Sequence, residues 1–116
     1  MPRVRLLRWL IGLAALLWLC WPRPAWAGLP LEHGARLFEQ HCAGCHVNGG
    51  NIIRRGKTLQ LKALERQGIA SEQAIAAIAA AGQGQMSGYA SVLGEGGAEA
   101  VAAWVWQQAL AGWPKP

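Results

Sequence analysis

Two cysteines three residues apart, followed at once by a histidine, constrain this chain more than any other feature. They form the motif Cys42-Ala43-Gly44-Cys45-His46. The residues before it repeat small or apolar side chains at intervals of 4, 3 and 4 (Leu31, Ala35, Phe38, Cys42), which is the spacing of one helix face. The sequence therefore predicts two thiols and an imidazole gathered at the end of a helix.

The C-x-x-C-H spacing is the attachment signature of c-type haem, in which both thiols form thioethers and the histidine lies under the iron. A thioredoxin-like redox pair needs a preceding strand, and no strand pattern precedes Cys42. A structural zinc ion needs four ligands, whereas Cys42, Cys45 and His46 supply only three. A plain disulfide suits an exported protein but gives His46 no role. The motif favours one haem c bound to Cys42 and Cys45, with His46 as an axial ligand.

Met86 is the candidate for the sixth iron ligand, since cytochromes use Met or His there. It is the only methionine besides Met1. It lies in a polar, glycine-rich stretch between two predicted helices, where a loop can carry a thioether over the second haem face. A lone methionine more often fills a gap in the core. The polar surroundings of Met86 favour its role as an iron ligand over a place in the core.

The first 27 residues have the three regions of a secretory signal peptide. Arginines at 3, 5 and 8 precede an apolar run of 12 residues, 9–20, and Ala25-Trp26-Ala27 offers small residues at a cleavage site. As a helix that run spans about 18 Å, short of the ~30 Å core of a bilayer. We expect cleavage after Ala27, export to a thylakoid lumen or periplasm, and a mature domain, 28–116, without a membrane anchor.

The positive charge of the chain is unevenly distributed. Residues 28–116 contain seven basic and six acidic side chains, so their net charge is +1, against +5 for the whole chain. A nearly neutral domain is a poor nucleic-acid binder, and nucleic acid is excluded as a partner. Five basic residues gather in one stretch, which suits either docking of an acidic partner or a solvated helix surface (Arg54, Arg55, Lys57, Lys62, Arg66).

The rest of the mature chain has helical periodicity and glycine-rich joints. Thr58 and Ser71 are expected to cap two helices, the second of which ends at Gly82. Residues 83–97 are expected to be mostly irregular, and a last helix covers about 98–110. No stretch alternates as a strand does. The sequence predicts an all-α fold in a single small domain.

The mature chain resembles the small class I c-type cytochromes, and among them the cytochrome c6 family. The resemblance rests on the haem motif, on Met86 and on several shared segments (Gly34-Ala35-x-x-Phe38, Gly49-Gly50-Asn51, Lys57-Thr58-Leu59, Ser71-Glu72-x-Ala74-Ile75, Val101-Ala102-Ala103-Trp104-Val105, Gly112-Trp113). It implies a class I cytochrome c fold around one haem, in which Gly34 and Phe38 cross the last helix at Trp104. It also implies that Asn51 and Lys57 reach the haem propionates and that Phe38, Ile78 and Trp104 form the apolar shell of the haem.

The implied function is that of a monomeric one-electron carrier, not an enzyme, in photosynthetic or related electron transport. Its redox partners would bind transiently, with the cytochrome b6f complex as a candidate donor. Some family members carry a basic residue after the position of Gly82 that docks photosystem I, whereas this chain has Gln83. That departure argues against photosystem I as the acceptor.

A second departure is Ile78, which stands where typical members have Gln beside the haem. The resemblance implies a lowered reduction potential, as in the Ile-type relatives. A lost hydrogen bond of about 1 kcal/mol, felt by one oxidation state only, shifts a one-electron potential by about 43 mV. Ile78 also suits a plain core position on an apolar helix face.

Two other functions remain open at this point. In a haem-based sensor or peroxidase-like protein, Met86 would not bind the iron and the sixth position would be open to small ligands. In a structural dithiol domain, Cys42 and Cys45 would carry no haem.

Overall fold

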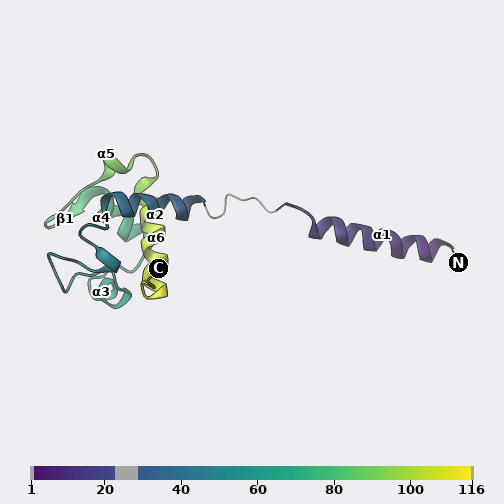
Figure 1. The fold of residues 1–116 in the computed structure, drawn as a ribbon, viewed down its shortest axis with the longest axis horizontal. Helices are drawn as coiled ribbons and strands as arrows, with labels where there is room; N and C mark the ends of the chain where they lie inside the picture. The colour runs from purple at the N-terminus through teal and green to yellow at the C-terminus, as the bar shows by residue number, and fades with distance from the viewer. Residues whose placement is uncertain (1, 23–28, 116) are drawn as a thin grey trace.

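Helices make up most of the computed structural model, which describes residues 2–22 and 29–115 (Figure 1). The order of elements is α1 (Pro2–Leu19), α2 (Leu29–His41), a 3-10 turn η2 (Val47–Gly49), α3 (Leu61–Arg66), α4 (Glu72–Ala81), β1 (Gly82–Gln83), β2 (Met86–Ser87), α5 (Ala90–Leu93) and α6 (Gly97–Ala111). This mostly helical architecture confirms the predicted fold class.

The N-terminal helix α1 contributes nothing to the core. None of its residues is buried, and Trp9 and Trp18 are 75% and 86% exposed. None of the helices within the described residues is long and apolar enough to cross a membrane. The expected cleavage site after Ala27 lies outside the described residues.

The centre of the domain is the crossing of α2 and α6. A side chain at Gly34 of α2 would collide with the backbone carbonyl of Ala100 on α6, so only glycine allows this approach. One turn later the ring of Phe38 packs against Trp104, with centroids 4.8 Å apart, and against Trp113 at 5.6 Å. The implied crossing of Gly34 and Phe38 with the last helix at Trp104 is confirmed.

The second face of α6 packs against α4. Ile75 and Ala79 of α4 are buried in the same apolar cluster as Val101, Ala102 and Val105 of α6. Ala102, a small residue of α6, is fully buried in this cluster. Helix α6 thus packs against both α2 and α4, and the functional site is built against it.

Both predicted ends of α4 are confirmed. The hydroxyl of Ser71 accepts a hydrogen bond from the backbone N–H of Ala74 (3.1 Å), as an N-cap does. Gly82 ends the helix at a φ of 81°, which favours glycine.

The prediction that the chain contains no strands is wrong at 82–87. A two-stranded antiparallel ladder pairs Gly82 with Ser87 and Gln83 with Met86. Gly84 at the turn has a φ of 57°, so the chain can reverse within a few residues. Each strand has two residues, too short for an alternating pattern to be visible in the sequence. The short helix α5 also lies in the stretch expected to be irregular.

The expected N-cap at Thr58 is wrong as well. Gln60 occupies the N-cap position of α3, which begins at Leu61. The backbone N–H of Leu59 donates to the carbonyl of Gly49 (2.7 Å), which holds the chain extended there. The Thr58 hydroxyl instead accepts from the N–H of Gln60 (3.4 Å) and shapes the turn before the helix.

The crossing at Gly34 yields a stability prediction. Gly34→Ala places a methyl group against the Ala100 carbonyl, and we expect the free energy of unfolding to fall by about 1–3 kcal/mol. Urea unfolding of the mature protein measures it. Gly56→Ala is the matched control, because a Cβ there meets no atom within 4 Å. Equal effects of the two substitutions would contradict the close approach.

Candidate functional site

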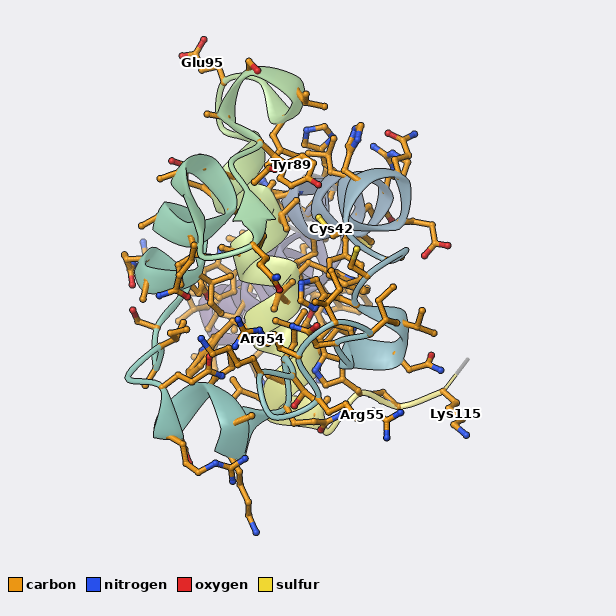
Figure 2. All side chains as sticks on the ribbon, turned by 90° about the vertical axis from the view of Figure 1, so that its left-hand side faces the viewer. Cys42, Arg54, Arg55, Tyr89, Glu95 and Lys115 are labelled. Carbon is orange, nitrogen blue, oxygen red and sulfur yellow. The ribbon has the colours of Figure 1, made fainter. Side chains whose placement is uncertain are left out.

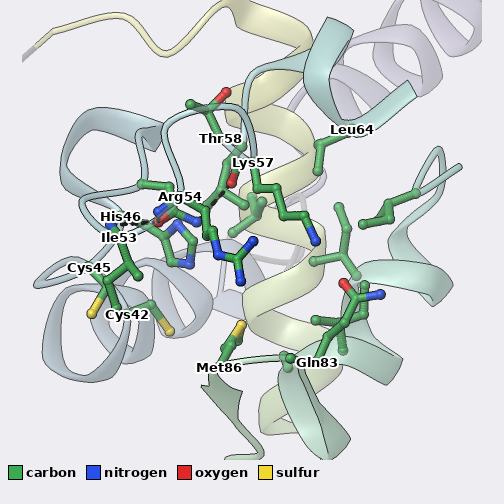
Figure 3. A pocket seen from close by; sticks show the side chains of 18 of the residues that line it. Cys42, Cys45, His46, Ile53, Arg54, Lys57, Thr58, Leu64, Gln83 and Met86 are labelled. Atoms are coloured by element: carbon green, nitrogen blue, oxygen red, sulfur yellow. Dashed lines mark hydrogen bonds between the residues drawn. The ribbon is translucent and has the colours of Figure 1, made fainter. Parts of the chain in front are cut away.

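A cavity lies between the end of α2, the loop over 51–59, α4, α6 and the β1–β2 hairpin (Figure 3). Most of its wall is apolar (Phe38, Leu59, Leu64, Ile69, Ile75, Ile78, Ala79, Val101, Val105). The sulfur and imidazole groups of the motif line it on one side, and Met86 lines it on another. The tertiary fold thus brings Met86 and the motif, which are far apart in the sequence, to the same cavity.

The motif coils into a tight turn at the end of α2. The N–H groups of Cys42 and Ala43 both donate to the Phe38 carbonyl (2.8 Å each). The N–H groups of Cys45 and His46 then donate to the Cys42 carbonyl (3.2 and 3.0 Å). Because of this turn, Cys42, Cys45 and His46 all line the same cavity.

The His46 ring is oriented by a backbone carbonyl. Its Nδ1 lies 2.8 Å from the carbonyl oxygen of Gly50, and a carbonyl can only accept, so Nδ1 is the protonated ring nitrogen. The Nε2 lone pair then remains available as a ligand. The geometry matches the usual arrangement in which a metal-bound histidine donates through its other nitrogen.

The thiol of Cys42 is half-buried and lies near Cys45. Burial raises the pKa of the Cys42 thiol, and the neighbouring Cys45 raises it further. Within 2–22 and 29–115, no group of three His, Cys, Asp or Glu side chains that could hold a metal ion is found.

Met86 is held by the hairpin that follows α4. A Cβ at Gly88 would collide with the carbonyl of Ala80, and the N–H of Tyr89 donates to the carbonyl of Ala79 (2.9 Å). These contacts fasten the hairpin to the last turn of α4. Figure 3 shows the Met86 sulfur directed into the cavity, toward the side that carries His46 and the cysteines.

Polar and basic groups lie along the 51–57 loop. The Asn51 carboxamide oxygen accepts from the N–H groups of Ile53 (3.0 Å) and Arg54 (2.7 Å), and its NH2 group donates to the Lys57 carbonyl (3.0 Å). Both Asn51 and Lys57 line the cavity, and the Asn51 side chain also builds the loop.

Ile78 and Trp104, two of the predicted neighbours of the cofactor, have different positions. Ile78 lines the cavity from α4. Trp104 is absent from the lining; its ring packs at a tilt against Phe38 and edge-on against Trp113 at the helix crossing. The ring of Trp104 contacts Phe38, which lines the cavity, so the predicted place of Trp104 in the apolar shell of the cofactor stays a prediction.

Sequence reasoning missed two features of the site. One is the Gly50 carbonyl that orients His46. The only sequence signal for this contact is the glycine pair at 49 and 50, shortly after the motif. The other is a contact across the cavity mouth, in which Arg54 Nε donates to Gln85 Oε1 at 3.4 Å. The two residues are 31 positions apart, and no local pattern predicts that they meet.

The residues present fit a haem c. Two thiols three positions apart match the two vinyl groups, and His46 Nε2 and the Met86 sulfur face an enclosure with apolar walls. Arg54 and Lys57 at its margin offer cations for carboxylates such as the haem propionates. Each of these side chains therefore has a group to bind on haem c, namely a vinyl group, the iron or a propionate.

Comparisons with known proteins agree with this site. A sequence model of the family described as "Cytochrome C oxidase, cbb3-type, subunit III" matches residues 30–105. A cytochrome c6-like protein of Nostoc sp. is 51% identical over 81 residues, which are 70% of this chain and 73% of the relative. The crystal structure of cytochrome c6B from Synechococcus sp. is 59% identical, with a TM-score of 0.71, and covers 78% of this chain and 98% of its own.

A more distant structure has the same fold. Oxidized cytochrome c6A from Arabidopsis thaliana is 36% identical, with a TM-score of 0.67, over 76% of this chain and 98% of its own. The range that the family model matches, 30–105, includes the cysteine–histidine motif and the hairpin. The chain therefore belongs to the cytochrome c6 family of class I c-type cytochromes, and it contains one covalently bound haem c.

Proposed function

We propose that this protein is an exported one-electron carrier of photosynthetic or related electron transport, in which His46 and Met86 bind the haem iron. The observation that carries the proposal is the direction of the Met86 sulfur, which points into the cavity opposite the motif (Figure 3). His/Met ligation raises the potential of a cytochrome and leaves no coordination site for substrate.

The protein's own residues supply attachment and orientation. Cys42 and Cys45 would form the two thioethers, and the Gly50 carbonyl orients the His46 ring so that Nε2 would be free to bind the iron. The bound haem supplies an iron that gains or loses one electron. The hairpin holds Met86 through the backbone contacts of Gly88 and Tyr89 with α4.

Apolar walls keep water from the site. Leu64, Ile75 and Val101 are buried and line the cavity, and they provide few dipoles that would reorient when the charge changes. Such a rigid, dry shell suits repeated electron transfer without bond breaking.

The proposed partners are redox proteins that bind transiently, through a small interface, to a monomer of this chain. The cytochrome b6f complex is the proposed class of donor. Gln83 is exposed on β1 in the position where some relatives of this family carry a basic residue, so photosystem I is disfavoured as the acceptor. One relative, from Arabidopsis thaliana, is described as chloroplastic, which supports a lumenal location as one of the two proposed compartments.

Substitution of Met86 tests the ligation. We expect Met86→Ala to lose the low-spin His/Met spectrum and to bind carbon monoxide when reduced, because the sixth position is then open. Visible spectroscopy with and without carbon monoxide measures both. Ser87→Ala is the control. If the wild-type reduced protein already binds carbon monoxide, the sensor or peroxidase-like function replaces the carrier.

Substitution of Ile78 tests the tuning of the potential. We expect Ile78→Gln to raise the reduction potential by about 43 mV, for a hydrogen bond of about 1 kcal/mol made in the reduced state only. Potentiometric titration measures the shift, with Ile78→Val as the control that keeps an apolar wall. An unchanged potential would leave Ile78 as a core residue without a redox role.

We further propose that residues 1–27 are a signal peptide. The helix α1 buries none of its residues and leaves many large apolar side chains in contact with solvent, which a stable domain avoids. We expect the mature protein to begin at Gly28, and intact-mass analysis of the exported protein measures it. Retention of Met1, or acylation of Cys20, contradicts the cleavage.

A further inference from the structure

The last aromatic residue of the chain, Trp113, has a backbone conformation that side chains rarely adopt. It follows Gly112 at the end of α6, and its φ is 55°. A non-glycine residue in this left-handed region is strained, and it stays there only when surrounding contacts hold it. The backbone N–H of Trp113 donates to the carbonyl of Gln108 (2.8 Å), and the side chain is buried. The strained turn therefore directs a large aromatic ring into the core.

The indole of Trp113 begins a series of three hydrogen bonds that ends at the histidine of the motif. Its Nε1–H donates to the carbonyl of Leu59 (2.9 Å), and the N–H of Leu59 donates to the carbonyl of Gly49 (2.7 Å). The carbonyl oxygen of the next residue, Gly50, lies 2.8 Å from Nδ1 of His46. We call these five residues the Trp113–His46 network.

Close packing holds the network together as well as hydrogen bonds. Gly49 is buried at a φ of 76°, and a Cβ built on it would collide with the Trp113 ring. The ring therefore lies directly against the backbone that leads into Gly50. The N–H of Gly50 also donates to the carbonyl of Val47 (2.8 Å). With these contacts in place, the Gly50 carbonyl has little freedom to turn away from His46.

The network joins segments that are far apart in the sequence. The bond between Leu59 and Trp113 spans 54 positions. Figure 2 shows Lys115, two residues after Trp113, in the same lower part of the molecule as Arg55 of the 51–59 loop. The C-terminus thus reaches the loop that follows the motif, and only the tertiary structure connects it with His46.

The hydrogen bond at Nδ1 affects the nitrogen on the other side of the His46 ring. A carbonyl that accepts from Nδ1–H fixes the orientation of the ring and makes Nε2 a stronger electron donor. A stronger donor stabilises ferric iron more than ferrous iron and therefore lowers the reduction potential. A Gly50 carbonyl that is free to move would weaken this hydrogen bond and raise the potential.

We propose that Trp113 is a positioning residue that lowers the reduction potential by holding the Gly50 carbonyl against His46. The inference rests on the proposed carrier function, in which His46 binds the haem iron, and it adds a tuning residue at the far end of the chain. Trp113 acts through Leu59 and Gly49, by a hydrogen bond to the first and by contact with the backbone of the second.

Removal of the indole N–H tests the effect on the potential. We expect Trp113→Phe to raise the equilibrium constant for reduction of the mature holoprotein about threefold, which equals about 28 mV for one electron. Potentiometric titration at fixed pH and salt measures it. Trp106→Phe is the matched control, because Trp106 packs against the same apolar cluster but does not belong to the network. We expect the control to keep the wild-type potential, and equal shifts in the two variants overturn the proposal.

NMR of the reduced, 15N-labelled holoprotein measures the hydrogen bond itself. We expect the Nδ1–H proton of His46 to exchange with water about tenfold faster in Trp113→Phe than in the wild type, and at the wild-type rate in Trp106→Phe. Urea unfolding of both variants gives the part of the exchange that passes through global unfolding. A rate that rises only in proportion to lost stability assigns Trp113 to packing alone and overturns the proposal.

A second variant separates the hydrogen bond from the shape of the ring. Benzothienylalanine at position 113 has the two fused rings of tryptophan with sulfur in place of the N–H group, so it keeps the packing and loses the bond to Leu59. We expect it to raise the potential and the exchange rate as Trp113→Phe does, and it decides the outcome if Trp113→Phe fails to fold.

The same measurements separate the two levels of inference. Wild-type potential and exchange in the benzothienylalanine variant overturn the role of Trp113, while the carrier function stands. A wild-type holoprotein without a reversible one-electron wave overturns the carrier function and the tuning together.

Discussion

The close crossing of α2 and α6 is the contact on which the other elements depend. Gly34 lets the two backbones meet, and Phe38 then packs into the aromatic pair of Trp104 and Trp113. This packing fixes the direction of the last turn of α2. Since the motif continues directly from that turn, the same contact decides where Cys42 and His46 lie relative to α6.

A second set of contacts ties the loop region to the C-terminus. The indole N–H of Trp113 donates to the carbonyl of Leu59 (2.9 Å), and a side chain at Gly49 would collide with the Trp113 ring. The N–H of Leu59 in turn donates to the Gly49 carbonyl. The segment after the motif is thus anchored at its far end by the aromatic cluster. The near end is anchored by the hydrogen bond between His46 and the Gly50 carbonyl, so the loop over 51–59 is held from both sides.

The two faces of the cavity depend on different kinds of interaction. The side with the cysteines and His46 is built from local backbone hydrogen bonds within a few residues of the motif. The side with Met86 depends on glycines at 82, 84 and 88 that let a hairpin fold tightly against α4. The two sides of the cavity are therefore held in place by separate sets of contacts.

The sequence by itself determined the local chemistry. The motif spacing, the helix periodicity, the Ser71 cap and the glycine that ends α4 all depend on neighbours within about one helical turn, where side-chain identity is decisive. The resemblance added Gly34, Phe38 and Trp104 as a crossing, and the structure confirmed it. What sequence reasoning misjudged were the Thr58 cap and the absence of strands, because hydrogen bonds to distant residues at Leu59 and a short hairpin over 82–87 override local preference.

Only the tertiary structure decided which side chains share the cavity. Trp104 and Ile78 are both apolar helix residues, yet Ile78 lines the cavity and Trp104 faces the helix crossing. Arg54 meets Gln85 across 31 positions, and Ile52 and Ile53 remain exposed because hydrogen bonds to Asn51 and Cys45 fix their backbone. The direction of a side chain depends on how whole elements pack, and packing joins residues that no local pattern relates.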